Sequence, residues 1–259
     1  NDSDPVKLAQ LCLQALDDEI AFQGAGTIAA FIMEPILGAG GVIVPHASFM
    51  PGVAEICRKN GILLIADEVI TAFGRTGVWS GSRLWGVQPD FMCTAKAITN
   101  AYFPFGAVMI AEGVAQVFET DETGRAAIGH GYTYSGHPVG AAAALACLAE
   151  TQRLNVKDNA AARGAELFAG LNALMEKYEF IGDVRGGYGL MCALELVSDR
   201  ASKKPADKAT PGKVQATAYQ SGAMVRVSGN NIILSPPLIL TSADVQTIVR
   251  ALDAGFAAL

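Results

Sequence analysis

The chain has 259 residues, of which 51% are hydrophobic and 17% charged, and its mean hydropathy is +0.31. This composition excludes a disordered chain and provides enough apolar side chains for one large domain or two smaller ones. The formal net charge is −6 and no basic cluster stands out, which argues against a nucleic-acid partner.

The sequence also gives no support for a membrane or a metal partner. No apolar stretch approaches the roughly 20 residues that a membrane-spanning helix needs, and no signal peptide is recognisable. The five cysteines are scattered, without the paired spacing of a metal site. We therefore expect a cytoplasmic protein with reduced cysteines, no metal site and no membrane association.

The first 150 residues alternate between expected helices and strands. Apolar residues recur at helical spacing over about 5–23, and the apolar run 27–34 has the character of a buried strand. A helix is expected over 48–60, with Ser48 as its N-cap. Further strands are expected at 61–68, 91–95 and 106–111, and an alanine-rich helix at 137–154. This alternation predicts an α/β fold with a mostly parallel sheet.

From about residue 151 the pattern changes to that of an α+β segment. A helix is expected near 158–177, and glycines punctuate strands within 184–197. A polar connector over 198–211 precedes a helix, two short strands and a final helix from Ser242. We therefore place a domain boundary near 150, which gives domains over 1–150 and 151–259.

Charged residues follow two of the expected strands in the first domain. Asp67 and Glu68 end the strand written ILLIA, and Lys96 follows FMCTA. In parallel α/β sheets, ligands bind at the carboxyl ends of the strands, so Asp67 and Lys96 can face one crevice. Small and apolar neighbours around Lys96 favour loss of its charge and a role as a nucleophile. An ion pair, or two solvated loop residues, is the alternative on these residues alone.

Six motifs in order carry a family resemblance that covers essentially the whole chain. They read FIMEPILGAGGVIVP, LLIADEVITAFGRTG, PDFMCTAKAIT, GYTYSGHPVGAAAAL, GDVRGGYGLMCALELV and VRVSGNNIILSPPLILT. Together they resemble the pyridoxal-phosphate-dependent class III aminotransferases of the omega-amino acid or amine:pyruvate type. The resemblance implies the fold type I of aspartate aminotransferase, with 1–150 as the C-terminal part of the large domain and 151–259 as the small domain.

Applied to this chain, the resemblance implies three residues around the cofactor ring. Lys96 would form the Schiff base with pyridoxal phosphate and move a proton during the reaction. Asp67 would pair with the pyridine nitrogen and keep it protonated. Val69 would pack against one face of the ring. Glu68 also matches the motif, and we interpret it as structural.

The other implied contacts come from two later motifs. The resemblance assigns Tyr132 and Thr133 to the cofactor site, with the Thr133 hydroxyl on a phosphate oxygen of the other subunit's cofactor. The nearby His130 and His137 have no zinc-motif spacing, and we interpret them as structural. Arg226 would bind the substrate carboxylate through its planar guanidinium.

Departures from related branches indicate the substrate class. Ala39 stands where the ornithine and 4-aminobutyrate branches carry a glutamate that can pair with an active-site arginine, which leaves Arg226 available here. Ile70 replaces a glutamine near the cofactor's phenolic oxygen, and Ala72 and Ala101 replace glycines, so that their methyl groups could narrow the site. The absence of a glutamate at position 39 favours amines, short omega-amino acids and pyruvate.

The implied function is ping-pong transfer of an amino group from an amine or omega-amino acid to pyruvate or a related 2-oxo acid or aldehyde. The family's N-terminal phosphate-binding turn has no counterpart here, so we expect a C-terminal portion that works with its N-terminal portion in a homodimer with shared active sites. The alternatives are an aminomutase, a decarboxylating aminotransferase, or a non-catalytic module that binds pyridoxal phosphate or mediates dimerisation.

Overall fold

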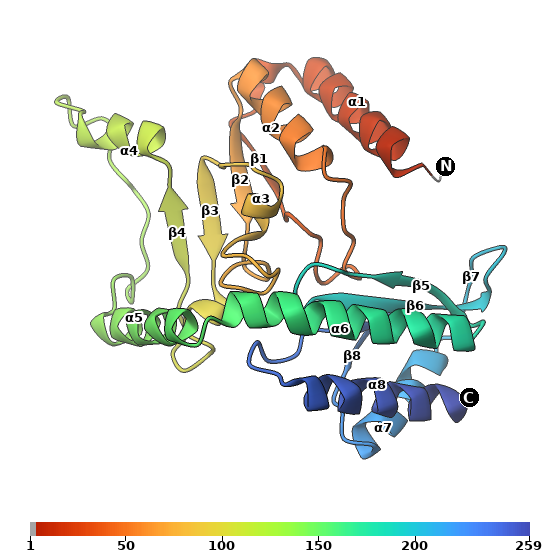
Figure 1. Cartoon of the computed structure of the whole chain (residues 1–259). Helices are drawn as coiled ribbons and strands as arrows, with labels where there is room; N and C mark the ends of the chain where they lie inside the picture. The colour runs from red at the N-terminus through yellow and green to blue at the C-terminus, as the bar shows by residue number, and fades with distance from the viewer. Residues whose placement is uncertain (1–3) are drawn as a thin grey trace. The chain divides into compact units, whose positions relative to one another are not determined.

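A computed structural model describes residues 4–259, which form two compact units (Figure 1). Unit 1 consists of the chain up to Pro35 together with Pro45–Phe73 and Ser80–Arg153. Unit 2 consists of Leu154–Leu259 and of two short segments, Ile36–Val44 and Gly74–Trp79. A single boundary near 150 does not anticipate these two segments, because their partners lie far along the chain.

The sheet of unit 1 has the strand order β1-β2-β3-β4. Its first three strands run parallel, and β4 is antiparallel to β3. Their bounds are Ala30–Met33 for β1, Leu63–Asp67 for β2, Phe91–Thr94 for β3 and Ala107–Ile110 for β4. This confirms the expected α/β class with mostly parallel strands, and all four strands lie within the expected ranges.

The helices of unit 1 begin and end for identifiable reasons. Asp4 caps the first helix by accepting a hydrogen bond from the Val6 amide at 2.9 Å, and Gly61 ends the second in the left-handed conformation. Ser48 is the N-cap residue of the second helix, as predicted, but its hydroxyl bonds to His46 and not to a helix amide. The helices are α1 (Pro5–Gln23), α2 (Phe49–Asn60), α3 (Gly81–Leu84), α4 (Glu112–Glu119) and α5 (Pro138–Arg153), with 3₁₀ turns at Ala25–Thr27 and Lys96–Ile98.

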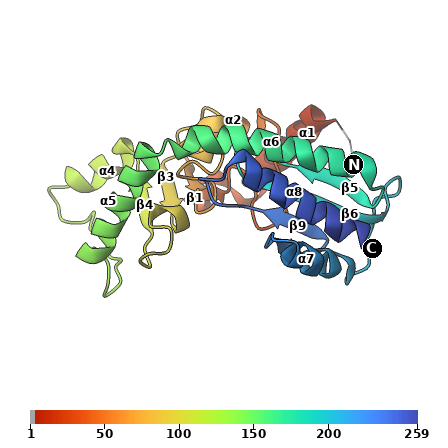
Figure 2. The same ribbon diagram turned by 60° about the horizontal axis from the view of Figure 1, so that its bottom comes forward.

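The sheet of unit 2 is antiparallel, with the order β5-β6-β9-β8 and a short strand β7 on β6. Its strands are β5 (Ile181–Arg185), β6 (Cys192–Asp199), β7 (Lys204–Pro205), β8 (Arg226–Ser228) and β9 (Asn231–Leu234). Its helices are α6 (Val156–Lys177), α7 (Thr210–Gln220) and α8 (Ser242–Ala257). Helices α6 and α8 lie side by side and α7 packs on α8 (Figures 1 and 2).

Alternation along the strands of unit 2 separates the two faces of the sheet. One face carries Val184, Leu194 and Ile232, which are buried in the same hydrophobic core as Leu167 of α6 and Leu252 of α8. The residues between them in sequence point to the opposite face, away from the helices. Within residues 4–259, no helix is long and apolar enough to cross a membrane.

Close backbone packing inside unit 2 predicts that a single added methyl group destabilises the fold strongly. A Cβ added at Gly164 in α6 would lie 2.0 Å from the carbonyl oxygen of Gly189, and neither backbone can withdraw without shifting its element. We expect Gly164→Ala to lower the free energy of unfolding by roughly 3 kcal/mol, as measured by denaturant titration.

The matched control is Gly212→Ala in α7, where an added Cβ meets nothing within 4 Å. This substitution should stabilise the protein by up to about 1 kcal/mol, because alanine favours a helix over glycine. Equal effects of the two substitutions would contradict the packing argument.

Candidate functional site

Asp67 and Lys96 lie at the same edge of the unit 1 sheet. Asp67 is the last residue of β2 and stands in register with Cys93 of the parallel strand β3. The next amide, that of Glu68, donates to the carbonyl of Cys93 at 2.9 Å, so the two strands remain paired up to their carboxyl ends. Lys96 follows Cys93 by three residues. The two side chains that the sequence singled out therefore start from neighbouring strand ends.

The Asp67 carboxylate is half-buried and only partly engaged. One oxygen accepts a hydrogen bond from the Val69 amide at 3.0 Å, which fixes the turn that follows β2. The other oxygen accepts no hydrogen bond from any residue in the described part of the chain, so it remains available to a cationic or N–H group. Burial, and to a smaller extent the nearby Asp67 carboxylate, raises the pKa of the Cys93 thiol.

Lys96 lies on a strained turn directly after β3. Its φ of 46° is in the left-handed region, which costs a non-glycine residue about 1 kcal/mol and occurs often at functional sites. Its side chain is exposed and makes no hydrogen bond or ion pair with the residues that the structure describes. Buried Thr99 holds the turn by donating to the Phe103 carbonyl at 2.7 Å. The amine is thus presented on a fixed backbone without a partner of its own.

The same turn gives a reason for one departure from the family pattern. Ala101 has a φ of 63°, a conformation that glycine adopts freely and alanine adopts only with strain. Its side chain is exposed, whereas Ala72 is buried. At position 101, where the family resemblance implies a glycine, a glycine would therefore relieve backbone strain.

Glu68 holds the segment that follows Asp67. Its side chain is fully buried, and its carboxylate accepts bonds from the Gly81 and Ser82 amides at 2.7 Å each and from the Thr71 hydroxyl. These bonds join the end of β2 to the start of α3. The burial and the saturated carboxylate agree with a structural role, and the sequence alone could not identify the three donors.

The loop before α5 presents Tyr132 and Thr133 at the surface of unit 1. Both side chains are exposed, and the Tyr132 amide donates to the Ser135 hydroxyl at 2.9 Å. The Thr133 hydroxyl has no partner among the described residues. His137 accepts from the Val139 amide at 3.2 Å, with its ring 5.1 Å from that of Phe103, as expected for a structural histidine.

No group of three or more potential metal ligands occurs within residues 4–259. Val69 and Ile70 are half-buried in the turn after β2. These two side chains lie next to Asp67 in the sequence, so both start from the same strand end as the carboxylate.

Arg226 belongs to unit 2, where it is the first residue of β8. Its side chain is exposed and makes no hydrogen bond or ion pair with the described residues. Ala39 lies in the segment Ile36–Val44 of the same unit, and its carbonyl accepts a hydrogen bond from the Ser228 hydroxyl at 3.4 Å. The arginine is therefore free to bind an anion.

Comparison with known proteins identifies one family. The chain matches the family described as aminotransferase class-III over residues 3–255. An amine transaminase from an uncultivated Pseudomonas species, solved in a PLP-bound form, is 49% identical with a TM-score of 0.95, over 98% of this chain and 58% of that chain. An (S)-enantioselective omega-transaminase from Thermomicrobium roseum is 39% identical with a TM-score of 0.92, over 98% of this chain and 56% of that chain.

Two curated relatives differ in their named substrates. The hypotaurine/taurine–pyruvate aminotransferase of Paracoccus denitrificans is 37% identical, over 92% of this chain and 54% of the relative. The mitochondrial gamma-aminobutyrate transaminase 1 of Oryza sativa subsp. indica is 38% identical, over 90% of this chain and 45% of the relative. The chain spans about half the length of the curated relatives it matches.

The proximity of Asp67 to β3 predicts that removal of its charge changes the reactivity of the Cys93 thiol. Because the Asp67 carboxylate raises the pKa of Cys93, Asp67→Asn should increase the thiolate fraction and accelerate alkylation of Cys93 by iodoacetamide near pH 8. The asparagine oxygen can still accept from the Val69 amide, so the turn is retained. The rate is measured by peptide mass spectrometry on cofactor-free protein, with exposed Cys12 as the internal reference. An unchanged ratio of the two rates would contradict the assigned proximity.

Proposed function

The chain belongs to the class III aminotransferase family, and we propose that it binds pyridoxal 5'-phosphate and moves an amino group from an amine or omega-amino acid to pyruvate or a related 2-oxo acid or aldehyde. The observation that carries the proposal is the placement of Asp67 and Lys96 at the carboxyl ends of two paired parallel strands. The named activities of the relatives support the same reaction class.

The residues at this edge fit the chemistry of the cofactor. Pyridoxal phosphate, when bound, supplies an aldehyde carbon that condenses with amines and a pyridine ring that takes up electron density from the substrate. The Lys96 amine has no competing partner, as required of a group that must bond to that carbon. The open oxygen of Asp67 can accept a hydrogen bond from a protonated ring nitrogen.

In the proposed reaction, Asp67 stabilises the charge on the cofactor ring and Lys96 transfers the proton. The carboxylate of Asp67 favours the protonated ring nitrogen, and the Val69 amide holds this carboxylate in place. Lys96 would hold the cofactor through its amine, and in its free form this amine would remove the proton from the substrate Cα. The same two residues would act first on the amino-group donor and then on the amino-group acceptor, as a ping-pong reaction requires.

Three further side chains complete the proposed cofactor site. We assign the half-buried Val69 to one face of the ring, and Tyr132 and Thr133 to the cofactor of the partner subunit in a homodimer. The exposed hydroxyl of Thr133, which lacks a partner in the described chain, supports a role as donor to a phosphate oxygen.

Arg226 is the proposed site for the carboxylate of pyruvate or of an amino-acid donor. Its guanidinium gives a planar, bidentate match to a carboxylate, and Ala39 places no acidic side chain nearby on the loop. The identities to the taurine and gamma-aminobutyrate enzymes are almost equal, so the assignment to the amine:pyruvate type rests on these two positions.

Assembly with other chain segments is part of the proposal. Apolar side chains stand exposed on α1, at Leu8 and Leu11, and on β4, at Val108 and Met109. These surfaces, and the coverage of about half of each relative, support assembly with an N-terminal portion of the same enzyme into a cytoplasmic homodimer. Residues 1–150 then form part of the large domain and 151–259 the small domain.

The first test is Lys96→Ala in the assembled, cofactor-supplied protein. Transfer of an amino group to added pyruvate should fall by about 10²- to 10⁴-fold or more, because both the covalent anchor and the proton carrier are lost. The unfolding transition should persist, since the Lys96 side chain bonds to no described residue. The control Lys208→Ala removes another exposed amine and should leave turnover unchanged. Retained turnover in Lys96→Ala would remove this residue from its assigned role.

A second test separates carboxylate recognition from the rest of the chemistry. Arg226→Ala should lower kcat/KM for pyruvate roughly 10- to 100-fold, because the charged hydrogen bonds to the carboxylate are lost. For an aldehyde acceptor, which lacks a carboxylate, the change should stay within about threefold. Equal losses with the two acceptors, compared in steady-state assays with one amine donor, would refute the assignment of Arg226.

A further inference from the structure

Two neighbouring rows of side chains cross strands β5, β6, β9 and β8 of unit 2 on the face of the sheet away from the helices. Residues directly opposite each other on paired strands share a face, as do residues two apart on one strand. The first row is Asp183, Glu195, Asn231 and Ser228, and the second is Arg185, Ala193, Ile233 and Arg226. Arg185 on β5 and Arg226 on β8 thus stand at opposite ends of one row.

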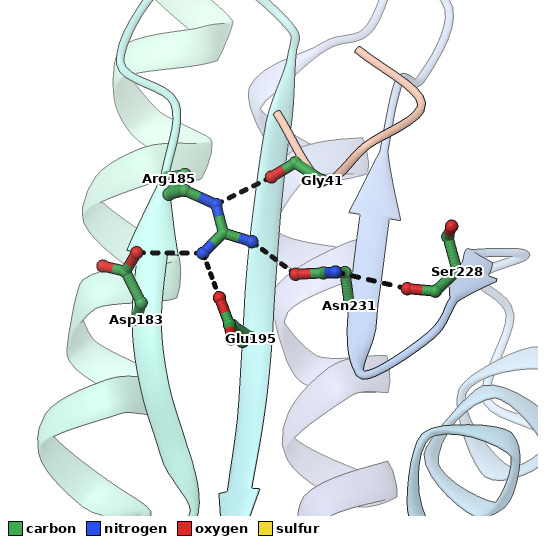
Figure 3. Close-up of polar contacts among 6 residues, drawn as sticks. All are labelled: Gly41, Asp183, Arg185, Glu195, Ser228 and Asn231. Atoms are coloured by element: carbon green, nitrogen blue, oxygen red, sulfur yellow. Dashed lines mark hydrogen bonds and ion pairs between the residues drawn. The ribbon is translucent and has the colours of Figure 1, made fainter. Parts of the chain in front are cut away.

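The segment Ile36–Val44, here called the 36–44 loop, bonds to this face at two points. The Arg185 Nε donates to the Gly41 carbonyl at 2.7 Å (Figure 3). The Ser228 hydroxyl, two residues from Arg226, donates to the Ala39 carbonyl at 3.4 Å. The tip of the loop is therefore joined to both edge strands, β5 and β8.

Arg185 is the centre of the polar network that makes this connection. Its Nη1 pairs with Asp183 at 3.0 Å and with Glu195, and its Nη2 donates to the Asn231 side-chain oxygen. Asn231 in turn donates to the Ser228 carbonyl at 3.2 Å, as Figure 3 shows. A continuous chain of hydrogen bonds thus runs from Arg185 on β5 to Ser228 on β8.

The loop is built to fit against this network. Gly41 has a φ of +114°, and a Cβ there would lie 3.0 Å from both the Arg185 Nη2 and the Asn231 Cγ. Two backbone hydrogen bonds between Leu37 and Ile43, of 3.1 and 2.9 Å, close the loop, and Val42 is fully buried. The 36–44 loop is therefore packed tightly against the polar network of Arg185.

The two arginines of the row have opposite surroundings. The Arg185 side chain is 17% exposed and pairs with two carboxylates, so it has no capacity left for a substrate anion. Arg226 is exposed and has no anionic partner in the described chain. It lies on a strand of three residues at the edge of the sheet, which pairs with β9 alone among the described strands. Few hydrogen bonds to neighbouring strands therefore fix the backbone position of Arg226.

We propose that Arg185 is a positioning residue for Arg226, which rests on the proposed function of Arg226 as the carboxylate site. Arg185 bonds to the 36–44 loop and to Asn231, and both of these bond to Ser228 of β8. Arg185 thereby holds β8 in place and fixes the backbone position of Arg226. Selectivity for substrates with a carboxylate thus depends on a residue that does not touch them.

The test compares two acceptors in a double-mutant cycle on the assembled, cofactor-loaded enzyme. Arg185→Met should lower the ratio of kcat/KM for pyruvate to that for an aldehyde roughly 3- to 10-fold, mainly through KM for pyruvate. In the Arg226→Ala background the same substitution should leave the ratio unchanged. Arg200→Met is the matched control, because Arg200 also bonds two carbonyls of unit 2, those of Met175 and Tyr178.

Two results would overturn the inference while leaving the role of Arg226 intact: an unchanged ratio in Arg185→Met, which includes equal losses with both acceptors, or a fall in the ratio that persists without Arg226. If Arg226→Ala alone leaves the ratio unchanged, the proposed carboxylate site fails and the inference fails with it. Arg185→Lys, which keeps the charge but loses the planar, five-donor guanidinium, is the milder variant and should show a smaller shift in the same direction.

A second readout does not depend on turnover. Hydrogen exchange of peptides that cover 36–44 should become faster in Arg185→Met, because the loop loses its bond at Gly41. The same peptides should be unaffected in Arg200→Met. Unchanged exchange in Arg185→Met would show that the loop is held without Arg185, which would overturn the proposal.

Discussion

The parallel pairing of β2 with β3 is the constraint on which the proposed chemistry depends. Parallel strands end at the same edge of a sheet, so a residue at the end of one is necessarily near a residue just past the end of the other. Asp67 and Lys96 occupy these two places. The buried carboxylate of Glu68 holds the segment that follows Asp67, and Thr99 holds the turn that carries Lys96. In the proposed site, the Lys96 amine and the Asp67 carboxylate therefore start from fixed, neighbouring backbone positions.

The fold was predictable from the sequence wherever the signal is local. Helical spacing identified α1, and alanine content identified α5, because both patterns report neighbours within one turn. The placement of the 36–44 loop in unit 2 was not predictable, since its bond to Arg185 joins residues 144 positions apart. The helix α4 has no buried residues, and it was not predicted although Val114, Val117 and Phe118 recur at helical spacing.

The candidate site, like the fold, was predictable from the sequence only in part. Strand ends with charged residues located Asp67 and Lys96 from the sequence, but their roles came from the family resemblance rather than from the pattern. The left-handed backbone at Lys96 had no sequence signal, because no glycine marks it. The bonds of Arg185 were also invisible, since each partner comes from a different strand or loop.

The most direct measurement is borohydride reduction of the assembled protein after incubation with pyridoxal phosphate, followed by peptide mapping. Reduction converts lysine-bound cofactor into a stable secondary amine, so mass spectrometry identifies the lysine that carried it. The account predicts a pyridoxyl group on Lys96 and on no other lysine. A pyridoxyl group on another lysine, or none on Lys96 with the N-terminal portion present, would contradict the central claim that the end of β3 carries the reactive amine.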